Sequence, residues 1–460
     1  MVLGYCYHLI MNRYFRWLFT FYILVRTVSF FLINFPIARE VIAAILIGTF
    51  AYFCIKNISF AWKLLAIELL LDGAGHFFEL HSLLMRTWVL GIFAAVWGWH
   101  KIRTRTKIIL PQKKILVTLG IFGAFLLWAI VNGFARGNAP HFIIQDAILY
   151  LFVLIIFPAL EMETNWQPLY DVAIKVFIIG SALFSTLTFA LYSTGQLILQ
   201  DSYYHWFRDV AAGKITDLGL HFFRIVNAEH LLFVPIILVF MYSLMKKTRD
   251  KKLWALLMCS LIVVILNFTR IYFLGLAVGA FVLLWNAPWR AWLSVSSLTL
   301  IISALIFFSA HGIASRGQSF GLELLGVRVT GITTPQTDMS GVIRMAMLPD
   351  IYRHIKARPL LGSGLGTEVT YLDPLTHTNK SRTQFDWGYF EMITELGALG
   401  TAAYIALLTL IIYNCPRRDL AAGAIALFVI NITTPALFQG FGVLYFVFLA
   451  TCAQIKISRS

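Results

Sequence analysis

About fourteen hydrophobic stretches, broken late in the chain by one long polar segment, constrain the fold of this 460-residue sequence more than any other feature. The polar segment runs from Ala310 to Phe390 and gathers Arg344, Arg353, His377 and Asp386. Charged side chains of this kind are costly in lipid. The pattern therefore predicts an all-α polytopic membrane protein of about 12–14 transmembrane helices, with a functional head outside the bilayer.

Three parts follow from this pattern. Residues 1–309 are predicted to form a transmembrane bundle with a polar extracytoplasmic segment at 200–229, residues 310–390 a large extracytoplasmic loop domain, and residues 391–460 the C-terminal transmembrane helices. If every stretch crosses, both polar segments lie on one face and both termini on the other. The basic loops share the face of the termini, which is then cytoplasmic; they are Lys101–Lys114, Lys246–Lys252 and Arg417–Arg418.

The composition excludes several functions. The chain is 59% hydrophobic, above the roughly 45–50% of soluble domains, and its net charge of +15 is explained by the basic loops, so nucleic acid is not an expected partner. None of the five cysteines lies in the long polar segment, and no His or Cys cluster has metal-site spacing. We therefore expect no disulfide, no metal and no cofactor. A site on the extracytoplasmic face has no access to nucleotide sugars, so its donor must already be activated.

Three arginines stand where an extracytoplasmic head group could reach them. Arg270 lies alone between two apolar runs, Arg224 closes the first polar segment, and Arg344 opens a helix-like stretch that ends at Ala357. The planar guanidinium matches phosphate oxygens, so three together could bind a diphosphate without a divalent ion. A snorkelling interfacial side chain for Arg270, and solvated loop residues for the other two, are the alternative interpretations.

Transfer of a sugar from such a donor needs a base that takes the proton of the acceptor hydroxyl. His377 and Asp386 are the two candidates. A loop histidine often has no catalytic role, and Asp386 could instead cap the helix predicted over Asp386–Gly397 or pair with Arg382. These residues leave the choice of base open.

Two charged residues fall inside predicted spans, Arg26 in the first and Glu68 in the third. Because a lone charge is costly in lipid, we expect both side chains to face the bundle interior. Either could serve there as a packing partner only.

Several motifs of the second half resemble the O-antigen ligase and O-antigen polymerase superfamily of membrane glycosyltransferases. Thr269-Arg270 resembles its Ser-Arg motif before a span, and Arg224 with Asn227 resembles its Arg-x-x-Gly segment. Arg344 resembles the family's helix arginine. The later sequence RPLLGSGLG, at residues 358–366, is similar to its Pro-Leu-x-Gly-x-Gly turn, and ELGALG, at 395–400, to its Glu-Leu-Gly-x-x-Gly motif.

This resemblance implies an inverting glycosyltransferase with a GT-C-like helical bundle, working at the outer face of the bacterial inner membrane. The donor would be an undecaprenyl-diphosphate-linked glycan. The acceptor would be a lipid-linked repeat unit in a polymerase or the lipid A core in a ligase, and a chain-length regulator is a possible partner. Ligases of the family typically carry a His-Asn pair where this chain has Asp386-Trp387, which favours the polymerase.

Two other classes share the span count and the basic loops. A flippase or transporter of lipid-linked oligosaccharide usually has two related halves with interrupted helices, whereas this chain has a single late, one-sided insertion. A non-catalytic scaffold of an envelope complex would tolerate changes at Arg270, Arg344 and Asp386. The insertion favours an enzyme over a transporter.

Overall fold

The computed structural model describes residues 2–71, 76–81, 83–162, 167–195, 200–285, 287–333, 339–374 and 376–457. Helices dominate the described residues, and three short antiparallel hairpins accompany them. Six of the described helices are long and apolar enough to cross a bilayer, and three shorter apolar helices lie among them. The prediction of an all-α polytopic membrane protein is confirmed.

The elements of the first half are α1 (Val2–Phe31), α2 (Pro36–Lys56), α3 (Ile58–Leu71), β1 (Glu79–Leu80), β2 (Leu83–Leu84), α4 (Met85–Thr104), α5 (Lys113–Ala135), α6 (Pro140–Leu151), the 3₁₀ turn η2 (Phe152–Ile155), α7 (Ile156–Met162), α8 (Gln167–Ser193), α9 (Gln200–His205), the π turn η4 (Trp206–Val210), β3 (Lys214–Asp217) and β4 (Phe223–Val226). The second half comprises the 3₁₀ turn η5 (His230–Leu232), α10 (Phe233–Lys246), α11 (Lys251–Asn267), α12 (Arg270–Leu284), α13 (Trp289–Ala314), α14 (Leu322–Thr333), α15 (Met339–Ala357), β5 (Val369–Leu372), β6 (Asn379–Arg382), α16 (Gly388–Asn414), α17 (Arg418–Ile430) and α18 (Gly440–Ile457).

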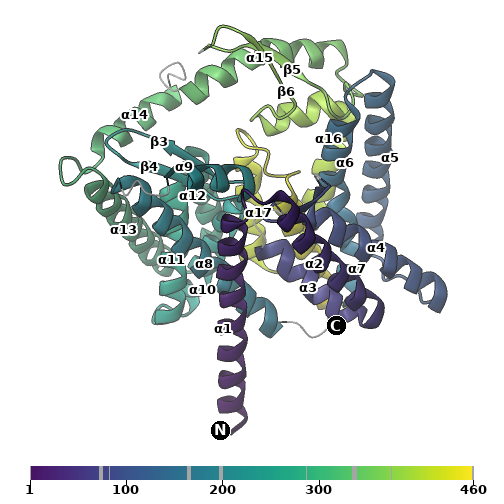
Figure 1. Ribbon diagram of the computed structural model, residues 1–460, viewed down its shortest axis with the longest axis horizontal. Helices are drawn as coiled ribbons and strands as arrows, with labels where there is room; N and C mark the ends of the chain where they lie inside the picture. Colours follow the sequence, from purple (N-terminus) through teal and green to yellow (C-terminus); the bar gives the residue numbers. More distant parts are fainter. Residues whose placement is uncertain are drawn as a thin grey trace.

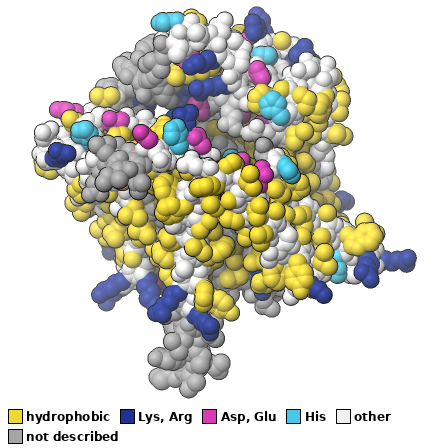
Figure 2. Space-filling view, viewed as in Figure 1, with side chains coloured by type: hydrophobic (Ala, Val, Ile, Leu, Met, Phe, Trp, Pro, Cys, Tyr) yellow, Lys and Arg dark blue, Asp and Glu magenta, His cyan; other side chains and the backbone are white. Residues whose placement is uncertain are grey.

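The bundle has the surface of a membrane protein. Hydrophobic side chains cover the middle of the molecule, and Lys and Arg gather along its lower edge (Figure 2). Many large apolar side chains are exposed, among them Ile37 at 78% and Leu300 at 72%. Acyl chains would cover such a band, since without lipid it would be an aggregation surface.

The polar elements lie at one end of the bundle. Helices α14 and α15 form an arch over the body, and the hairpins β3–β4 and β5–β6 lie at the same end (Figure 1). Both chain termini lie away from the arch. The shared face expected for the segments 200–229 and 310–390 is therefore what the fold has.

Local sequence explains several helix boundaries. Asp250 begins α11 by accepting hydrogen bonds from the backbone N–H groups of Lys252 and Leu253, at 3.0 and 3.3 Å. Phe268 ends α11 in the left-handed region at φ 48°, and α12 begins two residues later. Pro359 follows α15 closely and has no N–H to extend it.

Tertiary contacts decided other features. The helix predicted from Arg344 begins five residues earlier, at Met339, across a Ser-Gly pair with weak helix preference. Helix α14 and the hairpins lie in segments where hydrophobic periodicity predicted only polar loop. Short elements of this kind are fixed by packing more than by local preference.

Helix α12 packs closely against α17. A Cβ added to Gly275 would lie 3.0 Å from Ile430 Cγ1 and 3.2 Å from the Ala426 carbonyl oxygen. Small residues at such a contact let two membrane helices approach closely. The packing fixes α12, whose first residue is Arg270.

Candidate active site

The β3–β4 hairpin positions the first of the predicted arginines. Arg224 stands in β4, opposite Thr216 of β3. Its Nε donates to the Asn267 carbonyl oxygen, and one terminal nitrogen donates to Thr269 Oγ1, both at 2.7 Å. Both acceptors belong to the corner between α11 and α12, so this corner orients the Arg224 guanidinium.

Arg270 begins α12 directly after Thr269. The Arg270 backbone therefore adjoins the hydroxyl that accepts from Arg224. An N-terminal helix turn carries free N–H groups and a positive dipole, both of which favour an anion. The Arg224 side chain and the Arg270 backbone thus lie at one corner.

The third arginine comes from the arch. Arg344 lies in α15, and its carbonyl oxygen accepts from Trp387 Nε1 at 3.3 Å. Trp387 is the residue before α16, so this contact ties α15 to the start of that helix. Arg344 Nε is buried without a hydrogen-bond partner. A buried guanidinium donor left unsatisfied is expensive unless a ligand completes it.

Lys214 of β3 is the residue on which several of these charges act. The pKa of Lys214 is lowered from its ordinary value of 10.5, first by partial burial and then by Arg224, while Asp386 opposes the shift and Arg382 and Arg344 add to it. These five charged groups, Lys214, Arg224, Arg344, Arg382 and Asp386, are the outer charge cluster. The other four groups each act electrostatically on Lys214. Figure 2 shows a hollow beneath the arch with basic, acidic and histidine side chains near it.

Sequence reasoning missed Lys214 as a site residue and considered Arg382 only as a partner for Asp386. Both stand in short hairpins, β3–β4 and β5–β6, that no motif marks. Their presence in a polar segment on the arginine-bearing face was the only available signal.

Of the two candidate bases, Asp386 lies among these charges. It comes two residues before α16 and has a left-handed φ of 58°. Glu391 Oε2 accepts from the backbone N–H of the preceding residue, Phe385, at 3.0 Å, which fixes the chain there. A helix cap, one of the two other interpretations of Asp386, is not what the structure has, because α16 begins without a side-chain cap.

His377 is not among the charges acting on Lys214. It is exposed in the turn between β5 and β6, with a left-handed φ of 52°, and its backbone N–H donates to the Asp373 carbonyl oxygen at 2.9 Å. The structure thus places Arg224, Arg344 and Asp386 within electrostatic range of Lys214, and it begins α12 with Arg270 at the corner that orients Arg224. It does not bring His377 to them.

The glycine-rich turn at 358–366 locks the end of the arch into the membrane helices. Gly362 and Gly397 lie back to back, both with positive φ, and a Cβ on Gly362 would be 2.5 Å from the Gly397 nitrogen. Helix α16 has a kink at Gly397, and the Ser363 N–H donates to the Thr394 carbonyl oxygen at 2.7 Å. The turn at 358–366 therefore docks against the ELGALG segment.

The other side of this turn contacts α5 and α6. Asn132 Nδ2 donates to the Gly362 carbonyl oxygen at 3.1 Å, and the Gly366 N–H lies 3.1 Å from Asp146 Oδ2 and 3.2 Å from Glu395 Oε1. This docking sets the height of α15, and with it of Arg344, above the bundle.

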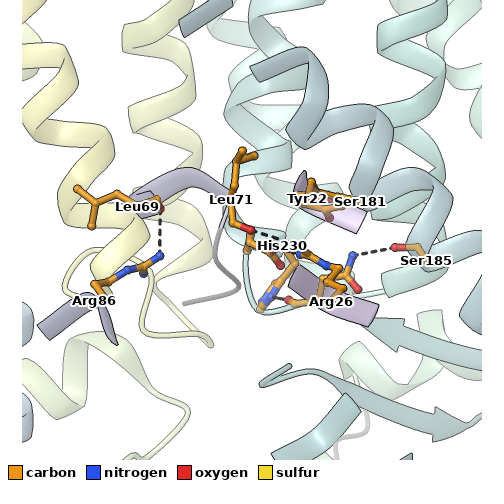
Figure 3. Close-up of polar contacts among 10 residues, drawn as sticks. Tyr22, Arg26, Leu69, Leu71, Arg86, Ser181, Ser185 and His230 are labelled. Carbon is orange, nitrogen blue, oxygen red and sulfur yellow. Dashed lines mark hydrogen bonds and ion pairs between the residues drawn. The ribbon is translucent and has the colours of Figure 1, made fainter. Parts of the chain in front are cut away.

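A buried polar network joins α1 and α8 to the segment that follows Arg224, and Figure 3 shows its residues Arg26, Leu71 and Ser185. Arg26 of α1 donates to Glu229 Oε1 at 2.7 Å and to the Leu71 carbonyl oxygen at 3.2 Å, and Asn227 Nδ2 donates to Ser185 Oγ at 2.8 Å. The Arg26 guanidinium also lies 3.7 Å from the Tyr22 ring centroid.

The side chains of Arg26 and Glu229 are 7% and 2% exposed. The inward orientation expected of Arg26 is confirmed. The Glu68 side chain is only 11% exposed, and Glu68 Oε1 lies 3.7 Å from Arg86 Nε, so the same expectation is confirmed there. Because Asn227 and Glu229 follow Arg224 closely, these contacts fix the chain that carries it.

Among the described residues, no group of three or more His, Cys, Asp or Glu side chains could hold a metal ion. The outer charge cluster is mainly cationic, which suits an anion. A metal-independent reaction remains a prediction.

The comparisons with known proteins agree with the motifs. A family model described as O-antigen ligase matches residues 253–405, from α11 into α16, a segment that includes Arg270, Arg344 and Asp386. No curated protein and no solved structure gave a significant match. Residues 253–405 of this chain are thus similar to the O-antigen ligase family.

Proposed function

We propose that this protein is an inverting, metal-independent glycosyltransferase that moves a glycan from an undecaprenyl diphosphate carrier to an acceptor sugar hydroxyl. The observation that carries the proposal is the convergence of Lys214, Arg224 and Arg344 at one face, with the buried Arg344 Nε lacking a partner. A diphosphate supplies the negative charge and the acceptor oxygens that such a group of donors requires.

The proposed roles follow from position. Arg224 and Arg270 hold one side of the diphosphate from the corner between α11 and α12, and Arg344 closes over it from the arch. Lys214 adds a fourth cation. As the sugar leaves, negative charge grows on the diphosphate, and preorganised cations stabilise that transition state most.

We assign the base to Asp386 and not to His377. The acceptor hydroxyl oxygen attacks the anomeric carbon from the face opposite the diphosphate, and the new C–O bond forms as the bond to the diphosphate oxygen breaks. The electron pair leaves with the diphosphate, and the hydroxyl proton passes to the Asp386 carboxylate. Asp386 lies among the cations, whereas His377 lies in an exposed hairpin turn.

The proposal places this reaction at the periplasmic face of the bacterial inner membrane. The cluster lies at the end of the bundle away from both termini (Figure 1), and the basic loops argue for a cytoplasmic location of the termini. Asp386-Trp387 in place of a His-Asn pair favours a polymerase, whose acceptor is a second lipid-linked repeat unit, over a ligase acting on the lipid A core.

The direct test supplies purified protein with a synthetic undecaprenyl-diphosphate repeat unit and follows glycan length by gel or mass spectrometry. We expect chain growth from the wild type and a severe loss from Arg270→Ala. Growth at the wild-type rate in that variant would refute the diphosphate assignment. In a deletion strain, single-repeat surface glycans would mark a polymerase and unattached long chains a ligase.

A transporter remains the alternative function. It would carry the lipid-linked glycan across reconstituted vesicles without forming a glycosidic bond. The same purified protein decides between the two, because product analysis and translocation can be measured on one preparation.

A further inference from the structure

A groove on the face away from the arch has no place in the proposed reaction. It lies between the end of α2, the start of α3 and the last turns of α4, and its volume is about 710 Å³. The residues that characterise it are Cys54, Lys56, Ile58, Trp99, His100 and Arg103. This size is within the range of small-molecule and lipid head-group sites.

The charges of the groove are of one sign. Lys56 ends α2, and His100 and Arg103 lie in the last turns of α4. Within the described part of the chain, none of these three side chains has an ion pair or a hydrogen bond, and no carboxylate lines the groove. Lys101 of the same turn differs, because it is buried against Glu161 at 2.5 Å.

The other half of the groove is apolar and open to lipid. Ile55 is 75% exposed, and Trp99, at 66%, has the amphipathic ring that settles at a membrane interface. An occupant must therefore offer negative charge at the level of Lys56 and Arg103 and hydrocarbon beside Ile55. A free phosphate offers only the first.

We infer that this groove binds the head group of an anionic phospholipid, with its phosphate between Lys56 and Arg103 and its acyl chains along Ile55 and Trp99. Basic pockets between membrane helices select such lipids, because each Lys or Arg gains attraction from a head group without a positive charge of its own. A zwitterionic lipid brings its own cation and gains less. The site is independent of the diphosphate site, which lies at the opposite end of the bundle.

The test uses the full-length protein in detergent, titrated with phosphatidylglycerol or phosphatidylcholine and observed by native mass spectrometry. We expect bound phosphatidylglycerol to survive gas-phase activation better than phosphatidylcholine. The double variant Lys56→Gln/Arg103→Gln should lower its affinity by about tenfold or more. The matched control Arg105→Gln/Lys107→Gln removes the same charge from the adjoining loop, outside the groove, and should bind as the wild type does.

Each other result overturns the inference. Equal retention of both lipids by the wild type would show no anionic preference, and this comparison needs no variant. An equal loss in the control pair would indicate general surface attraction. Competition by glycerol 3-phosphate as strong as that by phosphatidylglycerol would indicate a free phosphate site. Lys56→Arg/Arg103→Lys, which keeps the charge, should retain binding; its loss would exclude an electrostatic origin.

Discussion

The bundle interior and the outer charge cluster differ in how their cations are paired with carboxylates. Inside the bundle each buried cation faces a carboxylate: Arg26 faces Glu229, Arg86 faces Glu68, and Lys101 faces Glu161. In the outer cluster, the groups that act on Lys214 are three arginines and a single aspartate. The bundle is therefore balanced for stability, whereas the cluster holds like charges together at a cost to folding, as sites that bind an anion do.

The two regions are also held in different ways. Arg26 is oriented by a charged partner, a backbone carbonyl and an aromatic ring. Arg224 is oriented by the Asn267 carbonyl and the Thr269 hydroxyl, which are neutral. Neutral acceptors of this kind orient a guanidinium without adding a counter-charge of their own.

The largest expected effect concerns the single aspartate of the cluster. Asp386→Asn keeps the shape but cannot take a proton, so we expect the rate of glycan transfer to fall roughly 10²- to 10⁴-fold. His377→Gln should leave the rate nearly unchanged, because His377 lies in an exposed turn. Single-turnover assays with the lipid-linked donor measure both. The opposite ranking would move the base to His377.

The next largest effect concerns the stability that the buried Arg26–Glu229 ion pair maintains in the bundle. Arg26→Met leaves Glu229 buried without its partner, and we expect a loss of about 3–5 kcal/mol in stability. Glu229→Leu should cost a similar amount, and the double variant should recover much of it, because no charge is then left unpaired. Thermal unfolding in detergent gives the three values. If the two losses of stability add in the double variant, the Arg26–Glu229 ion pair is not the cause of either loss.

Arg344 gives a smaller effect of a different kind. Arg344→Ala should lower the rate of transfer about 10²-fold with little change in unfolding temperature, because it removes a donor to the diphosphate. Arg353→Ala is the control on the same helix, since the Arg353 side chain is 76% exposed and pairs with Asp350. Equal losses of activity in both variants would point to the helix and not to Arg344.

The smallest effect is expected at Lys214, where a substitution should raise stability slightly and weaken donor binding. The lowered pKa means that the folded protein holds the Lys214 proton less tightly than the unfolded chain does. This penalty is present below the lowered pKa and is relieved as pH rises toward 10.5. Lys214→Gln should therefore raise the unfolding temperature slightly at pH 7 while raising the KM for the donor a few-fold.

A pH series completes that test. The stability difference between Lys214→Gln and the wild type should shrink as pH approaches 10.5. A difference that stays constant with pH would show that crowding by like charges is not its cause. A variant that loses both stability and affinity would make Lys214 an ordinary structural residue.

Much of the site was predictable from the second half of the chain. Thr269-Arg270, Arg344 and the glycine-rich turn were recognised by local pattern, because each depends on residues that are neighbours in sequence. The identity of the base was not predictable, since His377 and Asp386 stand nine positions apart in one polar segment. Only the fold distinguishes the two candidate bases. His377 lies in the exposed turn between β5 and β6, and Asp386 lies just before α16.

The sequence by itself determined that the chain enters a membrane, where its polar segments fall and which family its residues 253–405 resemble. Those properties follow from the transfer of local stretches between water and lipid and from short motifs. Tertiary structure alone placed Arg224 and Arg344 within electrostatic range of Lys214, because that placement depends on the β3–β4 pairing and on the glycine-rich turn docking between α5, α6 and α16. Contacts between residues distant in sequence carry no local signature, and the placement of the charge cluster depends on such contacts.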